Sequence, residues 1–287
     1  MNTTGLHSVL VGEAGPYVVF LHGLFGQGKN WTSIAKALAD SYRVLLVDLP
    51  NHGRSAWTER VSYPEVASTV GELIDARRAE DGSSAPVAVV GHSMGGKVAM
   101  TLALLRPALV ERLCVVDVSP VRYSTLSSFA EFLRGMRQLD LDRLPDRMAA
   151  DEALTPYVPD STVRSFLLQN LRRQPVSAAG PGSSAAAWRW QLNIELIDDQ
   201  LGELGDWPTE LSGPYLGPTL WVAGGDSRYV LPEYGPIMRE LFPRAQLVTV
   251  KKAGHWVHSD QPEVFSAILR RFLRDSPASP DSPEDAG

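Results

Sequence analysis

The chain has 287 residues, of which 44% are hydrophobic and 21% charged, as expected for a globular enzyme able to bury a large core. Its formal net charge is −6 and it carries no basic run, so no global field favours nucleic acid or an acidic membrane as a partner. No apolar run is long enough to span a bilayer, and the first residues lack the pattern of a secretory signal. We therefore expect a cytoplasmic protein without stable membrane insertion. Its one cysteine, Cys114, rules out an internal disulfide.

The N-terminal part of the chain alternates predicted strands with predicted helices. Apolar runs predict strands at residues 7–11, 17–21, 43–47, 86–90 and 112–116. Helical spacing of apolar residues predicts helices at residues 30–38, 63–79 and 94–105. This alternation is typical of an α/β protein with a mostly parallel sheet flanked by helices, in which reactive groups gather beyond the carboxyl ends of the strands.

The alternation stops between about Ser119 and Pro214. Helical patterns at 129–139, 161–171 and 188–201, with no convincing strand, predict a helical cap inserted between two sheet strands. Strands then return at 219–223 and 246–250, and a last helix is predicted at 262–273. We assign residues 1–118 and 215–274 to the core and 119–214 to the cap. We expect a mobile loop at Gln174–Ala187 and a disordered acidic tail at 275–287.

The candidate nucleophile lies where a buried strand meets a helix, in Gly91-His92-Ser93-Met94-Gly95. Glycines at both ends of this G-x-S-x-G sequence allow the sharp strand-to-helix turn of a nucleophile elbow. The Ser93 hydroxyl would then point out of the sheet beside the first amides of the helix. The alternative is a glycine-rich turn in which Ser93 only caps the helix.

A serine nucleophile needs a base, and histidine is suited to this because its pKa lies near neutrality. His255 follows the last predicted strand, at the same sheet edge as Ser93, whereas His258 leads into the final helix. We predict His255 as the base, because a loop directly after a strand can aim this side chain back at the serine. A metal site formed by the two histidines is disfavoured, because no third ligand has a suitable spacing. Asp117 and Asp226 each follow a strand and could orient the base. The residues alone leave this choice open.

Acyl transfer also needs two N–H groups to hold the developing oxyanion. Met94, directly after the nucleophile, is one candidate. Leu24 is the other, in the loop His22-Gly23-Leu24, where Gly23 lets the backbone approach and His22 braces the loop. This chemistry uses no metal and no organic cofactor.

These motifs resemble those of the α/β-hydrolase superfamily, in the order His22-Gly23, Asp48 to Ser55, Gly91 to Gly96 and Gly254-His255. The subgroup that the chain resembles is the YbfF-like esterases, whose pattern is similar to Leu21 to Gly26, Gly96-Lys97, Val116 to Pro120, Gly224 to Ser227 and Gly254 to Trp256. The resemblance implies the α/β-hydrolase fold, with the cap inserted after the sixth sheet strand. It also implies Asp117 as the triad acid and Ser227 as a supporting hydrogen-bond partner. Asp226, where the subgroup tends to have asparagine, departs from the pattern.

The resemblance implies hydrolysis of carboxylic esters or thioesters of short to medium acyl chains through an acyl-enzyme, by a monomer or homodimer. Three other reactions use the same triad, namely C–C bond hydrolysis, a lyase reaction and cofactor-free perhydrolysis. A non-catalytic ligand-binding homologue is a further alternative, disfavoured because both nucleophile and base are present.

Overall fold

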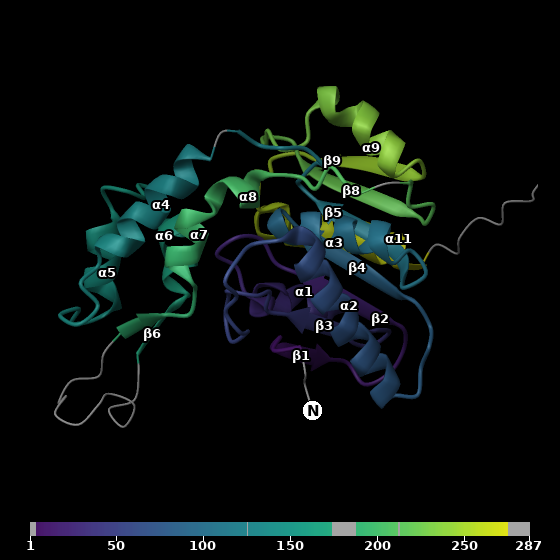
Figure 1. Ribbon diagram of the computed structural model, residues 1–287, viewed down its shortest axis with the longest axis horizontal. Helices are drawn as coiled ribbons and strands as arrows, with labels where there is room; N and C mark the ends of the chain where they lie inside the picture. Colours follow the sequence, from purple (N-terminus) through teal and green to yellow (C-terminus); the bar gives the residue numbers. More distant parts are fainter. Residues whose placement is uncertain (1–3, 125, 174–187, 212, 275–287) are drawn as a thin grey trace, which may run out of the picture.

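The strands of the core form one seven-stranded sheet in the computed structural model, which describes residues 4–124, 126–173, 188–211 and 213–274 (Figure 1). The strand order is β1-β3-β2-β4-β5-β8-β9, and β1 is antiparallel to β3 while the other neighbours are parallel. The strands are β1 (Ser8–Val11), β2 (Tyr17–Leu21), β3 (Arg43–Val47), β4 (Val87–His92), β5 (Val110–Val116), β8 (Thr219–Gly224) and β9 (Ala245–Val250). Every residue of β2, β4 and β8 is buried, which explains their continuous apolar sequences.

Helices cover both faces of this sheet. On one face α2 (Tyr63–Glu80), α3 (Met94–Leu105) and α9 (Gly235–Leu241) share an apolar cluster with alternate strand residues such as Val19 and Val89. On the other face α1 (Thr32–Leu38) and α11 (Pro262–Arg274) pack on the intervening residues, such as Val18 and Val90. Three short helices complete the core, namely η1 (Gly28–Trp31), η3 (Pro232–Tyr234) and α10 (Val257–Asp260). This arrangement confirms the predicted fold class.

The segment between β5 and β8 lies beyond the carboxyl ends of the strands and has an apolar cluster of its own (Figure 1). Its helices are α4 (Ser127–Gln138), α5 (Arg147–Leu154), α6 (Ser161–Leu168), α7 (Ile194–Asp199) and α8 (Leu201–Gly205). Phe25 from the loop after β2 packs into this cluster, where its ring lies 6.0 Å from that of Phe129. The contact ties the insertion to the loop that follows β2.

Three details of the insertion differ from the sequence-based expectation. The insertion follows β5, which is the fifth strand within the described residues, because a single antiparallel strand precedes β2. The predicted place after a sixth strand is therefore wrong by one strand. It contains a two-stranded hairpin of β6 (Leu171–Arg173) and β7 (Trp188–Trp190), where we expected helices. Helix α5 was not anticipated. The loop predicted at 174–187 and the tail predicted at 275–287 fall outside the described residues. None of the described helices combines the length and apolar character needed to cross a bilayer.

Candidate active site

Ser93 stands at the corner between β4 and α3 with a φ of 52°, a left-handed conformation that is strained for a residue with a side chain. The flanking glycines make the turn possible. A Cβ on Gly91 would lie 2.2 Å from the carbonyl oxygen of Gly95, and one on Gly95 would lie 2.5 Å from that of His22. The Ser93 side chain makes no capping hydrogen bond to α3, so the structure does not support the helix-cap alternative.

The Ser93 hydroxyl is hydrogen-bonded to His255, and His255 to Asp117. The distance from Ser93 Oγ to His255 Nε2 is 3.0 Å, and that from His255 Nδ1 to Asp117 Oδ2 is 2.8 Å. Because a carboxylate oxygen accepts, Nδ1 carries the proton and Nε2 is left to accept from the serine. The ring of Tyr229 stacks on the imidazole at a centroid distance of 4.1 Å. The histidine is therefore held in the tautomer and orientation of a general base.

Of the two candidate acids, the structure brings only Asp117 to the histidine. Asp117 is fully buried and has a φ of 49°. Its Oδ1 accepts a hydrogen bond of 2.9 Å from the Gly224 N–H, and its Oδ2 also accepts from the Ser227 hydroxyl. Asp226 is exposed, and its recorded hydrogen bond is the one its backbone N–H donates to the Ala253 carbonyl. The loop after β8 thus presents Ser227, and not Asp226, to the buried carboxylate.

The two N–H groups predicted to hold an oxyanion lie beside the serine. Leu24 and Met94 both line the cavity into which Ser93 points, and neither N–H has an acceptor within the described residues. Met94 is the first residue of α3, where an N–H has no partner inside the helix. A Cβ on Gly23 would lie only 3.2 Å from the Ser93 Cβ, so the backbone before Leu24 passes directly beside the nucleophile.

His22 braces this loop from behind. Its Nδ1 donates to the Gly23 carbonyl at 2.8 Å, and its Nε2 accepts from the Leu49 N–H at 2.9 Å. Burial lowers the pKa of His22, which keeps the ring neutral and able to accept the second bond. The loop after β2 is therefore fixed to the loop after β3.

Two other histidines near His255 are not arranged as bases. His92 donates from Nε2 to the His255 carbonyl at 2.8 Å, and burial, followed by the charges of His255 and His258, lowers the pKa of His92 well below its ordinary value. His258 is buried and stacks on Trp31 at 4.1 Å, and burial lowers its pKa to about 3. Both rings stay neutral and act as packing and positioning groups.

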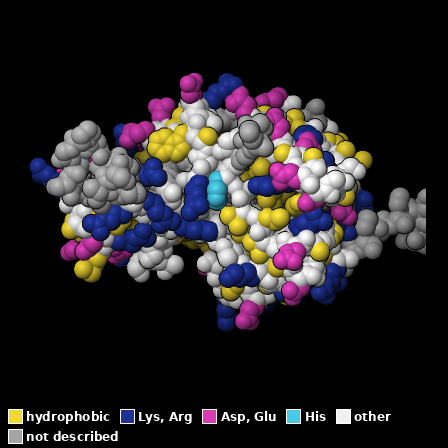
Figure 2. Space-filling view, turned by 90° about the horizontal axis from the view of Figure 1, so that it is seen from below, with side chains coloured by type: hydrophobic (Ala, Val, Ile, Leu, Met, Phe, Trp, Pro, Cys, Tyr) yellow, Lys and Arg dark blue, Asp and Glu magenta, His cyan; other side chains and the backbone are white. Residues whose placement is uncertain are grey.

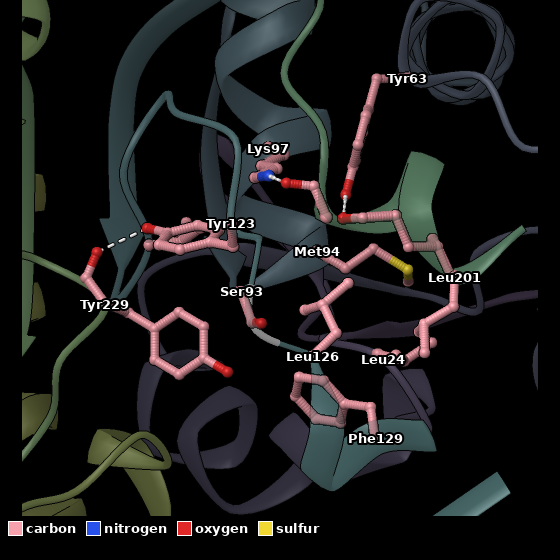
Figure 3. Close-up of a pocket in the computed structure, with 13 residues that line it drawn as sticks. Leu24, Tyr63, Ser93, Met94, Lys97, Tyr123, Leu126, Phe129, Leu201 and Tyr229 are labelled. Carbon is pink, nitrogen blue, oxygen red and sulfur yellow. Dashed lines mark hydrogen bonds between the residues drawn. The ribbon is translucent and has the colours of Figure 1, made fainter.

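The cavity beside Ser93 has walls from the core and from the insertion. Figure 3 shows the Ser93 hydroxyl pointing into the space between Tyr229, Leu126 and Phe129. The centre of a water molecule can move through about 30 Å³ of this space, so the cavity is narrow.

Lys97 is a site residue that the sequence analysis named only as part of the YbfF-like pattern, without assigning it a role. Its side chain is 1% exposed, and its ammonium donates to the carbonyls of Gly205 at 2.8 Å and Asp206 at 2.6 Å. The Tyr123 ring lies 4.8 Å from the same ammonium. Burial lowers the pKa of Lys97 to about 7. The signal in the sequence that could have indicated a buried lysine was its position within a largely apolar helix.

Comparison with known proteins supports the same family. The chain is 40% identical to the sn-1-specific diacylglycerol lipase ABHD11 of Mus musculus over 274 residues, which are 93% of this chain and 84% of that protein. It is 28% identical to esterase YbfF of Escherichia coli (strain K12) over 258 residues, 90% of this chain and 93% of that protein. Among solved structures, a marine microorganism esterase matches with a TM-score of 0.86 and 32% identity, covering 93% of this chain and 99% of that one.

The profile of the alpha/beta hydrolase fold family matches residues 16–262, which is most of the chain. The region includes every motif on which the predicted resemblance was based, and YbfF is itself one of the relatives. The resemblance is therefore confirmed, and the chain belongs to the alpha/beta hydrolase fold family.

Proposed function

We propose that this protein is a serine hydrolase that cleaves carboxylic esters or thioesters through an acyl-enzyme. The observation that carries the proposal is the continuous hydrogen-bonded chain from Ser93 through His255 to Asp117, with Ser93 lining a cavity. The names of the relatives, lipase and esterase, support ester hydrolysis and do not favour C–C cleavage, a lyase reaction or perhydrolysis. A non-catalytic homologue would have no need of an intact chain of this kind.

In the first half-reaction, Ser93 Oγ attacks the acyl carbonyl carbon while His255 Nε2 takes its proton. Asp117 stabilises the imidazolium that forms. The carbonyl oxygen becomes an oxyanion, to which the N–H groups of Leu24 and Met94 are free to donate. The positive end of the α3 dipole adds to this stabilisation. The imidazolium then gives its proton to the leaving alcohol or thiol, and the acyl group stays on Ser93.

In the second half-reaction, a water molecule gives its proton to His255 and attacks the acyl-serine carbonyl. The same two N–H groups hold the second oxyanion, and the returned proton frees Ser93 as the carboxylic acid leaves. Every proton moves between the substrate, water, Ser93 and His255.

The insertion supports a preference for short to medium acyl chains. We propose that residues 119–214 act as the cap and residues 1–118 and 215–274 as the hydrolase core. Leu126, Phe129 and Leu201 from the cap side close the cavity over Ser93 and leave little free volume. A small acyl group fits this space with little rearrangement, and each added methylene displaces more of the cap.

Ser93→Ala tests the proposal directly. The variant should lose hydrolysis of p-nitrophenyl esters and labelling by a fluorophosphonate probe, while its circular dichroism and melting temperature stay close to those of the wild type. An acyl series of esters and matched thioesters then ranks the substrates. Labelling that persists at another serine, or unchanged hydrolysis in Ser93→Ala, would remove the proposed nucleophile.

A cytoplasmic location, a monomeric or homodimeric state and freedom from nucleic acid remain proposals from the sequence. Cell fractionation tests the location, and sedimentation of the purified chain tests the oligomeric state. The negative net charge supports the absence of nucleic acid as a partner.

A further inference from the structure

Lysine and arginine side chains gather in a band on the face seen in Figure 2, although the chain as a whole carries a net charge of −6. We define the basic surface as five residues from separate parts of the fold. They are Lys29, Arg54, Arg147, Arg172 and Arg189, from η1, the loop after β3, α5, β6 and β7. Four of them are exposed, and Arg172 is half-buried.

Amide side chains bring the insertion close to Lys29. Gln27 Nε2 donates to Asn170 Oδ1 at 2.6 Å, which joins the loop before η1 to the corner between α6 and β6. Arg172 lies two residues after Asn170, so this bond brings it toward Lys29. The β6–β7 register then places Arg189 directly opposite Arg172.

The loop after β3 reaches the same corner through Gln191. The Gly53 N–H donates to the Gln191 carbonyl at 2.8 Å, and Arg172 Nε donates to Gln191 Oε1 at 2.9 Å. Arg54 is therefore beside the hairpin. Arg147 joins from α5, where its guanidinium donates to the carbonyl of Leu171 at 2.7 Å.

Within the described part of the chain, none of the five cations forms an ion pair with an aspartate or glutamate. Partial burial, and then the charge of Arg172, lowers the pKa of Lys29. Burial, and then the charges of Arg147 and Arg54, lowers the pKa of Arg172. The nearby Asp48 carboxylate is buried and accepts from the Gly28 and Arg54 N–H groups. The basic surface thus holds mutually repelling charges, which an external anion would stabilise.

The basic surface lies on the same sheet edge as the nucleophile. Lys29 and Arg54 sit in segments that follow the carboxyl ends of β2 and β3, and β2 is the direct neighbour of β4. Strands are spaced about 5 Å apart, so the loop after β3 starts roughly 10 Å from the end of β4 and Ser93. Whatever binds the surface comes near the cavity.

Two exposed apolar side chains lie close to these cations in the sequence. Trp57, three residues after Arg54, is 58% exposed, and Met148, adjacent to Arg147, is 77% exposed. Basic groups together with single exposed aromatic or long apolar side chains are typical of surfaces that lie in a lipid headgroup region.

We propose that the basic surface docks the protein on an anionic lipid surface, with Lys29, Arg54, Arg147, Arg172 and Arg189 contacting phosphate or carboxylate headgroups. Docking would be peripheral and reversible, since it rests on charge and two apolar side chains. It would hold the cavity of Ser93 near the headgroup region, and it does not depend on the reaction that Ser93 performs.

Sedimentation with lipid vesicles tests this proposal. The test variant is Lys29→Gln/Arg54→Gln/Arg189→Gln, because these three side chains are exposed and make no hydrogen bond within the described residues. The wild type should bind vesicles of phosphatidylcholine mixed with phosphatidylserine and should bind pure phosphatidylcholine far more weakly. Each basic residue near such a surface contributes enough for the triple variant to lose about a hundredfold in partitioning.

The matched control is Lys36→Gln/Arg239→Gln/Lys251→Gln, which removes three exposed positive charges outside the basic surface. It should change vesicle partitioning less than threefold, as expected for a weak, screened effect of net charge. Both triple variants should hydrolyse a water-soluble p-nitrophenyl ester at the wild-type rate, which reports correct folding. Equal binding to neutral and charged vesicles, equal losses in the two variants, or binding of heparin without binding of vesicles would each overturn lipid docking.

Discussion

The two walls of the cavity are held in different ways. The core wall carries Ser93 and Asp117 directly after the neighbouring strands β4 and β5, each at a positive φ that the buried sheet maintains. Hydrogen bonds of 2.8 and 3.0 Å link both residues through His255. The cap wall carries apolar side chains such as Leu126, which contribute no polar group to this chain of bonds.

The core wall therefore holds the groups that react, and the cap wall shapes the space that the substrate must fit. Groups that react must keep their positions within fractions of an ångström, and only the sheet edge provides that rigidity. Groups that fit the substrate need shape, and the cap supplies it through packing that can adjust. Changes in the core wall should therefore lower kcat, and changes in the cap wall should redistribute substrates.

Asp117→Asn should have the largest effect among the changes that keep Ser93 and His255. An amide in this place no longer favours the Nδ1–H tautomer or stabilises the imidazolium, so kcat should fall about 10³–10⁴-fold. The measurement is steady-state hydrolysis of a p-nitrophenyl ester over a range of pH.

Asp226→Asn is the matched control, because it makes the same chemical change at the carboxylate on the neighbouring loop. Its side chain is exposed and does not reach His255, so kcat should stay within about twofold of the wild type, as for surface substitutions in general. A large loss in Asp226→Asn together with a small one in Asp117→Asn would reverse the assignment of the acid.

The same contrast explains what could be predicted from the sequence. Strands buried on both faces give continuous apolar runs, so the sheet, the turn at Ser93 and the place of His255 were predicted. The choice between Asp117 and Asp226 depends on how the loop after β8 turns, which side-chain spacing does not encode. The resemblance to YbfF-like esterases, and not the residues alone, favoured Asp117.

The cap was harder to predict because its elements are short. The strand Trp188–Trp190 has three residues, too few to establish an alternating pattern, and it lies directly before the helical pattern that continues to Leu201. Helix α5 has eight residues, of which Ala150 and Leu154 are buried, so it shows little apolar periodicity. A role for Lys97 was missed because a lysine in a helix is usually exposed.

Ser227→Ala should lower kcat by about tenfold, because the Asp117 carboxylate loses one hydrogen bond while the Gly224 N–H and His255 remain. A positioning role through Asp117 should also move the pH profile of kcat/KM, since the histidine titrates against an altered carboxylate. Loss of activity with an unchanged pH profile would indicate a purely structural role for Ser227.

Leu126→Ala tests the cap wall. Removing this side chain enlarges the cavity, so activity should shift toward longer acyl chains by several-fold per added methylene, with little change for acetyl esters. Leu141→Ala is the control, as it makes the same change in the cap cluster away from the cavity. An equal shift in both variants would mean that cap stability, and not cavity shape, governs the preference.

Lys97→Met should have the smallest effect on activity, and it probes the junction between the walls. The pKa of Lys97 is lowered from 10.5 to about 7 by burial, so between these values the unfolded chain binds more protons than the folded chain. The free energy of unfolding of the wild type should therefore rise as pH increases from about 7 toward 10. This added stability should disappear as pH falls back toward 7. The difference in melting temperature between wild type and Lys97→Met should increase over that range. Lys36→Met, at an exposed position, should show no such trend, and parallel curves for the wild type and Lys97→Met would contradict a buried lysine that is neutral at high pH.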